Sequence, residues 1–238
     1  MNPATTTVRG GGSLVRQAME AVTGHIRARA LRVGDTLPGE GHFAAELGVS
    51  RAVMREAFGA LAALNLIEVA NGRRPRVAAL DGSPLAASLA HAVSTDQVSV
   101  PQVWDVRRTL EVRTAELAAE NRTPEEAAQI VDLAEAIARA ADDMPQRAAY
   151  DIAFHLTIAQ ATHNELFRQI VASFGPMMEV AIPTAWRTRE TEEERIVVLE
   201  NHRNVARAIA AGDPGAARRA MEAHFDESVG HLLSSLEV

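Results

Sequence analysis

Apolar residues recur every three or four positions along most of the chain, which is the spacing of amphipathic helices. The stretch LGVSRAVMREAFGALAALNLI, residues 47–67, has the clearest pattern of this kind. Gly48 can adopt the left-handed conformation that ends a helix, and Ser50 is placed to cap the next helix. The pattern predicts two helices joined by a sharp turn, the second facing a core through five positions: Val53, Ala57, Ala60, Leu61 and Leu64.

Arg51 and Arg55 lie one turn apart on the other side of this second helix, near its start. A helix that points arginines outward from its first turns suits the major groove of DNA, where arginine meets phosphates or guanine edges. The alternative is a solvated basic face on a small helical domain. We expect Arg51 and Arg55 to contact DNA.

The rest of the N-terminal part predicts two further helices and a β-hairpin. One helix is expected from Ser13 and another after Pro38, and two short β-like runs lie on either side of Asn71-Gly72, a typical hairpin turn. Three helices followed by a hairpin predict a winged helix-turn-helix domain over residues 13–80. The Thr/Gly-rich residues 1–12 are expected to be disordered.

Residues 81–86 have the Gly, Ser and Pro content of a linker, and residues 87–238 have a helical pattern throughout. Thr123, Pro124 and the acidic residues after them mark the start of one helix. Further helices are expected near residues 85–97, 146–162, 164–185, 190–211 and 214–235. The fold class is therefore mainly α, with a C-terminal all-α bundle large enough to enclose a cavity.

The amino-acid composition excludes thiolate metal sites and gives no sign of a membrane span. The 238 residues include no cysteine, so metal binding would rest on histidine and carboxylate side chains. No apolar run approaches the roughly 20 residues of a membrane span, and we expect no membrane partner and a cytoplasmic location. The net charge is −7, yet residues 1–80 hold 10 arginines against 6 acidic residues. The basic excess thus coincides with the predicted helix-turn-helix.

Four polar residues of the bundle suggest a metal site. Asp151 and His155 are four positions apart and share a helix face. Gly212, Asp213 and Pro214 form a stop, a cap and a helix start, and one histidine lies ten residues from this turn on either side. His202 and His224 should therefore lie at the same height, roughly 15 Å from the turn. Oxygen and nitrogen ligands with open positions suit a borderline divalent cation, although a single histidine on a helix is more often packed or solvent-exposed than a ligand.

The N-terminal motifs GDTLPGE and ELGVSRAVMREAFGALAALNLIEV, with the wing that follows, resemble the DNA-binding domain of GntR-family bacterial transcription regulators. Ser50, Arg51 and Arg55 match the family pattern at positions used against operator DNA. The wing NGRRPRV resembles that of the fatty-acid regulator FadR, and the resemblance implies that it approaches the minor groove through Gly72, Arg73 and Arg74. Glycine replaces the usual Ser and Arg of the LPSER motif, so one common phosphate contact is missing.

Residues 100–235 resemble the FCD ligand-binding domain of the FadR branch, whose metal-binding members carry DxxFH and two later histidines. The resemblance implies one divalent ion, Zn²⁺ with Ni²⁺ or Mn²⁺ as alternatives, on Asp151, His155, His202 and His224. Arg107 falls on the RxxLE motif that holds an effector carboxylate; its alternative role is a salt bridge with Glu111 four residues on.

Trp186 is expected either to close the cavity over the effector or to belong to the core. The context resembles the sugar-acid regulators of the branch, so a sugar acid or hydroxy acid is the expected effector. We expect a homodimer on a palindromic operator, because paired half-sites multiply specificity, and a repressor that the effector releases. Two other functions stay open: a metal-dependent hydrolase or lyase, and an acyl-CoA-responsive regulator without metal. The helix-turn-helix argues against an enzyme.

Overall fold

The structure is a computed structural model that describes residues 11–140, 143–187, 189 and 191–234. The chain divides into two compact units, with the boundary between Pro84 and Leu85. Residues 1–10, and with them most of the segment expected to be disordered, lie outside the described residues. The first helix begins at Gly11, two residues before the predicted start.

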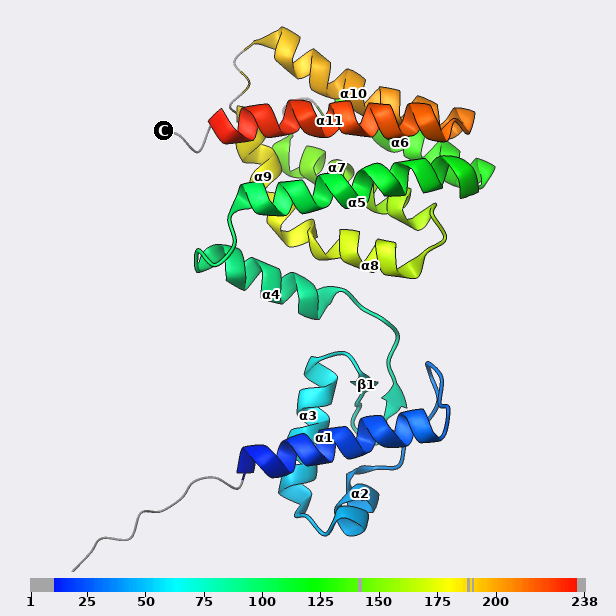
Figure 1. Ribbon diagram of the computed structural model, residues 1–238, viewed down its shortest axis with the longest axis vertical. Helices are drawn as coiled ribbons and strands as arrows, with labels where there is room; N and C mark the ends of the chain where they lie inside the picture. Colours follow the sequence, from blue (N-terminus) through cyan, green and yellow to red (C-terminus); the bar gives the residue numbers. More distant parts are fainter. Residues whose placement is uncertain (1–10, 141–142, 188, 190, 235–238) are drawn as a thin grey trace, which may run out of the picture. The chain divides into compact units, whose positions relative to one another are not determined.

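The N-terminal unit consists of three helices and a two-stranded wing (Figure 1). Its elements are α1 (Gly11–Ala28), α2 (Glu40–Leu47), α3 (Arg51–Ala63), β1 (Ile67–Glu68) and β2 (Arg76–Val77). The strands pair antiparallel, with Ile67 opposite Val77, and Thr36 adds an isolated bridge to Arg76. The predicted winged helix-turn-helix is confirmed.

Local signals account for the turn before α3. Gly48 ends α2 in the left-handed conformation, with φ of 66°, and the Ser50 hydroxyl accepts a hydrogen bond of 3.2 Å from the amide of Val53. Gly72 also has a positive φ, 71°, within the wing. These positions favour glycine because a Cβ atom is disfavoured at such φ values.

The predicted inward face of α3 is correct in part: Ala57 and Leu61 are buried, and Val53 packs against the core partly buried. Leu64 is 50% exposed, whereas Met54 and Phe58 are buried. The reason is the packing of Phe58 against Phe43 of α2, with ring centroids 6.0 Å apart, which turns that side of α3 inward. Four residues form the buried face of this helix: Met54, Ala57, Phe58 and Leu61.

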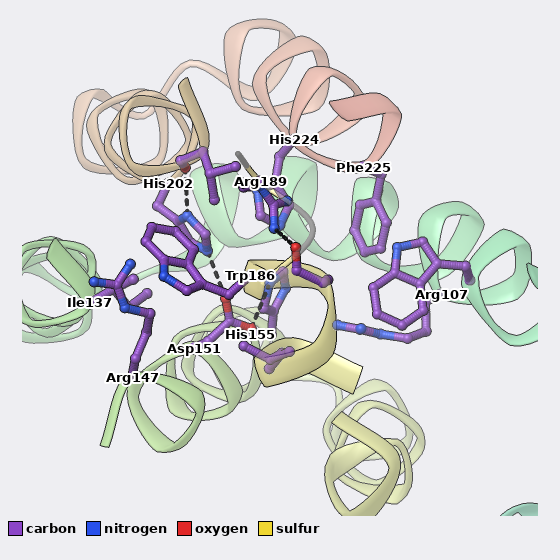
Figure 2. Close-up of a pocket in the computed structure, with 14 residues that line it drawn as sticks. Arg107, Ile137, Arg147, Asp151, His155, Trp186, Arg189, His202, His224 and Phe225 are labelled. Carbon is purple, nitrogen blue, oxygen red and sulfur yellow. Dashed lines mark hydrogen bonds and ion pairs between the residues drawn. The ribbon is translucent and has the colours of Figure 1, made fainter. Parts of the chain in front are cut away.

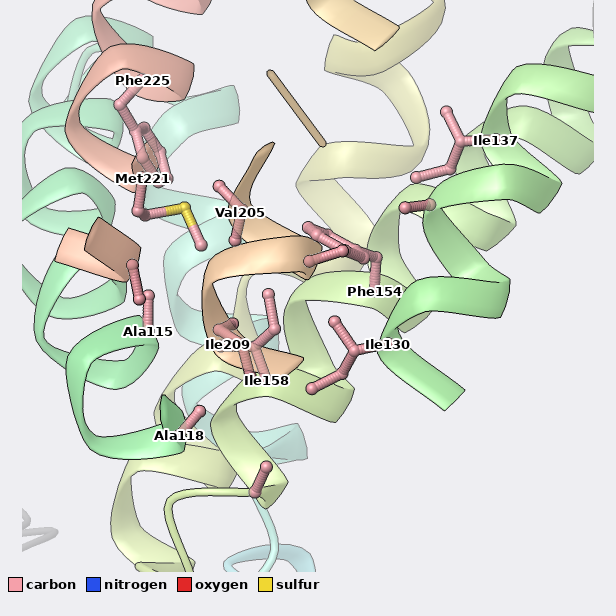
Figure 3. Packing of buried hydrophobic residues seen from close by; sticks show 14 of the residues in the cluster. Ala115, Ala118, Ile130, Ile137, Phe154, Ile158, Val205, Ile209, Met221 and Phe225 are labelled. Atoms are coloured by element: carbon pink, nitrogen blue, oxygen red, sulfur yellow. The ribbon is translucent and has the colours of Figure 1, made fainter. Parts of the chain in front are cut away.

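All the regular elements among the described residues of the C-terminal unit are helices, as predicted. Its helices are α4 (Ser83–Ser94), α5 (Val100–Asn121), α6 (Pro124–Arg139), α7 (Met144–Gln160), α8 (Glu165–Ser173), α9 (Gly175–Arg187), α10 (Glu192–Ala211) and α11 (Pro214–Ser234). Helix α11 packs along both α5 and α10, and α10 packs along α6, which lies against α7. Figure 3 shows the shared core, where Phe154, Val205 and Met221 meet fully buried.

Two predicted boundaries differ from the structure. Residues 164–185 form two helices, because Pro176 has no amide hydrogen and is accommodated in the first turn of a new helix, α9. Helix α4 begins at Ser83, inside the predicted linker, where the Asp81 carboxylate accepts a hydrogen bond of 3.0 Å from the Ser83 amide. The predicted linker, residues 81–86, is therefore helical from Ser83 onward.

The turn between α10 and α11 forms as its sequence predicts. Gly212 ends α10 with φ of 69°, and the Asp213 carboxylate accepts a hydrogen bond of 2.9 Å from the Ala216 amide. Arg122, at the end of α5, donates to the carbonyl oxygens of Ile209 and Ala210 at 2.9 and 3.2 Å. The arginine thus satisfies carbonyl groups at the end of α10 that have no helical partner.

Candidate metal centre and nucleic-acid interface

Three histidines from three helices converge in the C-terminal unit. His155 of α7, His202 of α10 and His224 of α11 each offer one ring nitrogen, and these atoms lie within 4.8 Å of one another. The rings of His202 and His224 are 4.4 Å apart between centroids, in keeping with their equal distance from the turn. All three side chains are buried, at 3%, 1% and 6% exposure. Figure 2 shows them around one cavity.

Asp151 lies beside the histidines, one turn before His155. Its Oδ1 is 2.9 Å from Nε2 of His202, and its Oδ2 is 3.8 Å from Nε2 of His155. Burial opposes the charged form, but the hydrogen bond from His202 and the neighbouring histidines hold the pKa of Asp151 well below its usual range. The carboxylate is therefore ionised, the state in which it can bind a cation.

The other ring nitrogens of two histidines have partners that fix their orientation. Nδ1 of His202 donates to the carbonyl oxygen of Val198 at 2.8 Å, and Nδ1 of His155 lies 2.5 Å from Oε2 of Glu111. Both contacts leave Nε2 directed toward the cavity. A carbonyl or carboxylate behind a histidine is the usual second partner of a metal-ligating imidazole.

The pKa of His224 also suits the binding of a cation. Burial lowers the pKa of His224 well below its ordinary value, and the charges of His202 and His155 lower it further. A neutral imidazole is the form that binds metal. Three imidazoles and one carboxylate are a donor set that fits Zn²⁺ and similar ions. The residues present therefore fit the metal that the sequence resemblance implies.

Arg107 makes the salt bridge with Glu111 that was expected as its alternative role. Its Nε donates to Oε1 of Glu111 at 2.7 Å, both side chains are buried, and its Nη1 contacts the sulfur of Met178. Arg107 also lines the cavity of the histidines. Burial would raise the pKa of Glu111, but the charges of Arg107 and His155 outweigh it and lower the pKa to about 2. The salt bridge expected as the alternative role of Arg107 is present.

Trp186 lines the same cavity and stacks with an arginine that the sequence analysis missed. Cζ of Arg147 lies 3.6 Å from the centroid of the Trp186 ring, and Cζ of Arg189 lies 5.9 Å from it. Both arginines line the cavity and are 3% exposed. A signal for Arg147 exists, because it precedes Asp151 by four residues and so shares its helix face. For Arg189 no comparable spacing is present.

The predicted DNA contacts lie on the surface of the N-terminal unit. Ser50, Arg51 and Arg55 are exposed at the start of α3, and Gly72, Arg73 and Arg74 are exposed in the wing. Arg76 differs, because its Nη1 donates to the carbonyl oxygen of Gly34 at 2.8 Å. The six exposed residues of α3 and the wing are available to a partner. Their contact with DNA stays a prediction.

Family comparisons agree with this architecture. Residues 14–77 match the bacterial regulatory proteins of the gntR family, and residues 102–227 match the FCD domain. The chain is a GntR-family regulator with an FCD domain. Membership of the GntR family gives the protein the coarse function of a transcription regulator.

Named relatives cover most of the chain. The HTH-type transcriptional regulator LutR of Bacillus subtilis is 30% identical over 84% of this chain and 92% of its own length. The Glc operon transcriptional activator of Escherichia coli is 30% identical over 82% of this chain and 79% of its own. The HTH-type transcriptional repressor NanR of Citrobacter rodentium is 29% identical over 84% of this chain and 78% of its own.

Solved structures are similar to the whole chain. The Streptococcus agalactiae GntR structure is 26% identical and has a TM-score of 0.61, covering 90% of this chain and 97% of its own. The structure of McbR/YncC of E. coli, at 20% identity and a TM-score of 0.50, agrees in fold and covers 94% of this GntR-family chain and 98% of its own. Over the residues that the structure describes, no helix is both long and apolar enough to cross a membrane.

Proposed function

We propose that this GntR-family protein binds a divalent metal ion and a small carboxylate effector in its FCD unit, and that the effector changes operator binding. The observation that carries the proposal is the convergence of His155, His202 and His224 on one buried cavity, together with Asp151 and Arg107. A bound divalent ion supplies a Lewis-acidic anchor for a carboxylate oxygen. A guanidinium in the same cavity supplies a second, charge-assisted contact.

The four proposed metal ligands are Asp151, His155, His202 and His224. We propose Zn²⁺ as the ion, with Ni²⁺ and Mn²⁺ as alternatives, because imidazole and carboxylate ligands suit all three. The sequence excludes thiolate ligands, since it contains no cysteine. Trp186 would cover the effector, because it lines the cavity and is only partly buried.

In the proposed complex with DNA, a homodimer binds a palindromic operator in the cytoplasm. Ser50, Arg51 and Arg55 of α3 would contact the major groove, and the wing would approach the minor groove through Gly72, Arg73 and Arg74. All six residues are exposed, which supports the assignment. One recognition helix reads only a few base pairs, so two are needed for specificity.

The proposed sign of regulation is repression that the effector relieves. The named relatives include both a transcriptional repressor and a transcriptional activator, so the sign needs its own measurement. An enzymatic alternative has less support. Glu111, a buried acid next to the cavity, is paired with Arg107 and His155, and Asp151 accepts a hydrogen bond from His202. Neither carboxylate is placed as a separate general base, which metal-dependent hydrolysis would require.

The metal part is tested with two histidine variants of the untagged protein. His202→Ala should lose stoichiometric metal, because it removes one of three converging nitrogens. His163→Ala is the matched control: that histidine is 51% exposed and pairs with Glu126 away from the cavity. Metal content is measured by plasma mass spectrometry after dialysis. Stoichiometric metal in His202→Ala would overturn the proposed site.

The effector part is tested by operator binding with hydroxy acids and sugar acids. A coupling free energy of about 2 kcal/mol would weaken operator binding roughly thirty-fold. Arg107→Lys keeps the charge beside Glu111 but loses the planar fork, so it should respond only at a higher acid concentration while keeping its metal. If no acid changes operator affinity in metal-loaded protein, the proposed effector class is wrong.

A further inference from the structure

The three histidines of the FCD unit are almost fully buried, so entry of a ligand requires part of the cavity wall to move. Most of the wall belongs to α5, α6, α7, α10 and α11, the helices of the packed bundle. Helix α9 completes it with the side chains of Ile182, Ala185 and Trp186. Access to the cavity therefore depends on which of these helices moves most easily.

Helix α9 packs mainly against α7 and borders a groove on each of two other faces. One groove, of about 450 Å³, lies among α4, α5 and α9, and its lining includes Val103 and Val180. The other, of about 660 Å³, is lined by α7 and α9 residues that include Ile152 and Pro183. An element with unfilled space beside it can be displaced without compressing a close-packed neighbour. Helix α9 has such space, whereas the bundle helices pack against one another.

Pro183 interrupts the hydrogen bonding within α9. A proline has no amide hydrogen, so the carbonyl oxygen of Glu179, four residues earlier, receives no helical bond from it. One residue later, the Thr184 hydroxyl donates to the carbonyl oxygen of Val180 at 3.0 Å, a type of contact that favours bending of a helix. Both features lie at the start of the turn that carries Trp186. This last turn can therefore bend away from the rest of α9 more easily than a regular helix would.

Side-chain contacts hold the two parts of α9 in place. Before Pro183, the sulfur of Met178 contacts Nη1 of Arg107 on α5. After Pro183, the Trp186 ring lies under Arg147 of α7, with Cζ 3.6 Å from the ring centroid (Figure 2). The Trp186 contact is made by side chains alone, so it can break and re-form while the backbone of α7 stays in place.

We propose that the last turn of α9, residues 183–187, is the gate of the histidine cavity, and that it opens about Pro183. Opening moves Trp186 away from Arg147 and exposes Ala185, while the part of α9 before Pro183 keeps its contacts. The inference goes beyond the proposed function, because it concerns access to the cavity for any ligand. Opening needs neither metal nor effector, so it is measurable on metal-free protein.

Thiol labelling measures the opening, because the chain has no cysteine of its own. Ala185→Cys places one thiol in the cavity wall, at a position that is 7% exposed. Ala206→Cys places one in the core of α10, at a position that is 2% exposed, and reports labelling through unfolding of the whole unit. Full-length protein, dialysed against a chelator, is treated with a chromophoric disulfide reagent. Ala185→Cys should react at least about tenfold faster than Ala206→Cys, because local opening needs less free energy than global unfolding.

A proline variant assigns the opening to the proposed hinge. Pro183→Ala restores the missing amide and should slow the labelling of Ala185→Cys at least about tenfold, because alanine is strongly favoured over proline inside a helix. Pro176→Ala is the matched control: Pro176 lies in the first turn of the same helix. An amide there has no helical partner in any case, so this variant should change the rate by less than about twofold.

The outcomes separate this inference from the proposed function. Circular dichroism and the thermal midpoint verify that each variant is folded. Equal labelling rates of Ala185→Cys and Ala206→Cys would show that the wall opens only when the unit unfolds, and the gate would be wrong. Undiminished labelling of Ala185→Cys in folded Pro183→Ala protein would also overturn the proposed hinge. If both rate differences are observed in a protein that binds no metal, the gate stands and the proposed function fails.

Discussion

Glu111 is the residue that connects the two predicted functions of the cavity. One of its carboxylate oxygens lies 2.7 Å from Nε of Arg107, and the other lies 2.5 Å from Nδ1 of His155. The same buried side chain therefore orients a candidate effector anchor and a candidate metal ligand. Metal and effector affinities should depend on it together, because neither partner can reorient without leaving the carboxylate unpaired.

Glu111→Gln should weaken metal binding by about 10–100-fold, the usual effect of removing a partner behind a ligating histidine. It should also lower the free energy of unfolding by about 3–5 kcal/mol, because a buried ion pair loses one member. Competition with a chromophoric chelator and urea unfolding measure the two effects. Glu116→Gln is the control, since Glu116 pairs with a half-exposed Arg113 and should change stability by less than about 1 kcal/mol. Unchanged metal affinity in Glu111→Gln would contradict the positioning role.

Residue spacing predicts some members of the site and not others. Asp151 and His155 share a helix face by their separation, and the turn at Gly212 brings His202 and His224 level. Their role as ligands stays a prediction. Arg189 was missed because it lies outside any helix, where no periodicity defines its direction. Only the packing around Trp186 reveals it.

For the helices, the sequence predicts where a helix begins and ends better than it predicts which face of the helix is buried. Ser50, Thr123 and Gly212 act through hydrogen bonds or φ values set within a few residues, so sequence alone suffices for them. The inward face of α3 depends partly on Phe43, which belongs to another helix, so the spacing within α3 predicts Ala57 and Leu61 correctly but misses Phe58. Packing between residues far apart in the sequence decides which face of a helix is buried.

Gly212→Ala tests the turn between α10 and α11. A non-glycine residue at φ of 69° costs about 1–2 kcal/mol, and its Cβ would lie 2.6 Å from Nη2 of Arg122. The midpoint of urea unfolding should fall accordingly, whereas Gly24→Ala, on α1 with open space around it, should not destabilise the protein. A Gly212→Ala midpoint equal to that of the wild type would show that Arg122 and the turn adjust freely.

The recognition helix is tested through Arg51→Ala and Arg55→Ala. Each should weaken operator binding by about 1–3 kcal/mol at fixed salt, because an outward arginine at the start of α3 is lost without any core contact. Fluorescence anisotropy measures the affinity. Arg139→Ala, an exposed arginine of α6, should bind the operator like the wild type. Wild-type affinity in both α3 variants would mean that this helix does not read the operator.

At the scale of the whole molecule, charge and chemistry are divided between the two units. The residues up to 80 carry 10 arginines and 6 acidic residues, and the remainder carries 14 and 25. The acidic part contains the histidine cluster, so a cation and a DNA backbone would each meet a unit of opposite charge. All four proposed ligands lie in the C-terminal unit, so chelation should act on that unit first.

Removal of the metal should destabilise the FCD unit selectively. A ligand that binds only the folded state contributes about 2.7 kcal/mol at a concentration of 100 Kd, and that stabilisation disappears on chelation. Differential scanning calorimetry before and after dialysis against a chelator should shift the transition that includes α7, α10 and α11. Operator binding without effector should change less. Identical thermograms would mean that no ion contributes to the folded state.

The helical hairpin of α10 and α11 also limits how the gene can vary. His202 lies ten residues before Gly212 and His224 lies ten residues after Pro214, so one residue inserted on either arm would turn its histidine by about 100° and displace it by about 1.5 Å relative to the turn. That histidine would leave the cavity although every ligand remained encoded. Most connecting loops tolerate insertions and deletions, but here a change of length on either arm moves a proposed ligand.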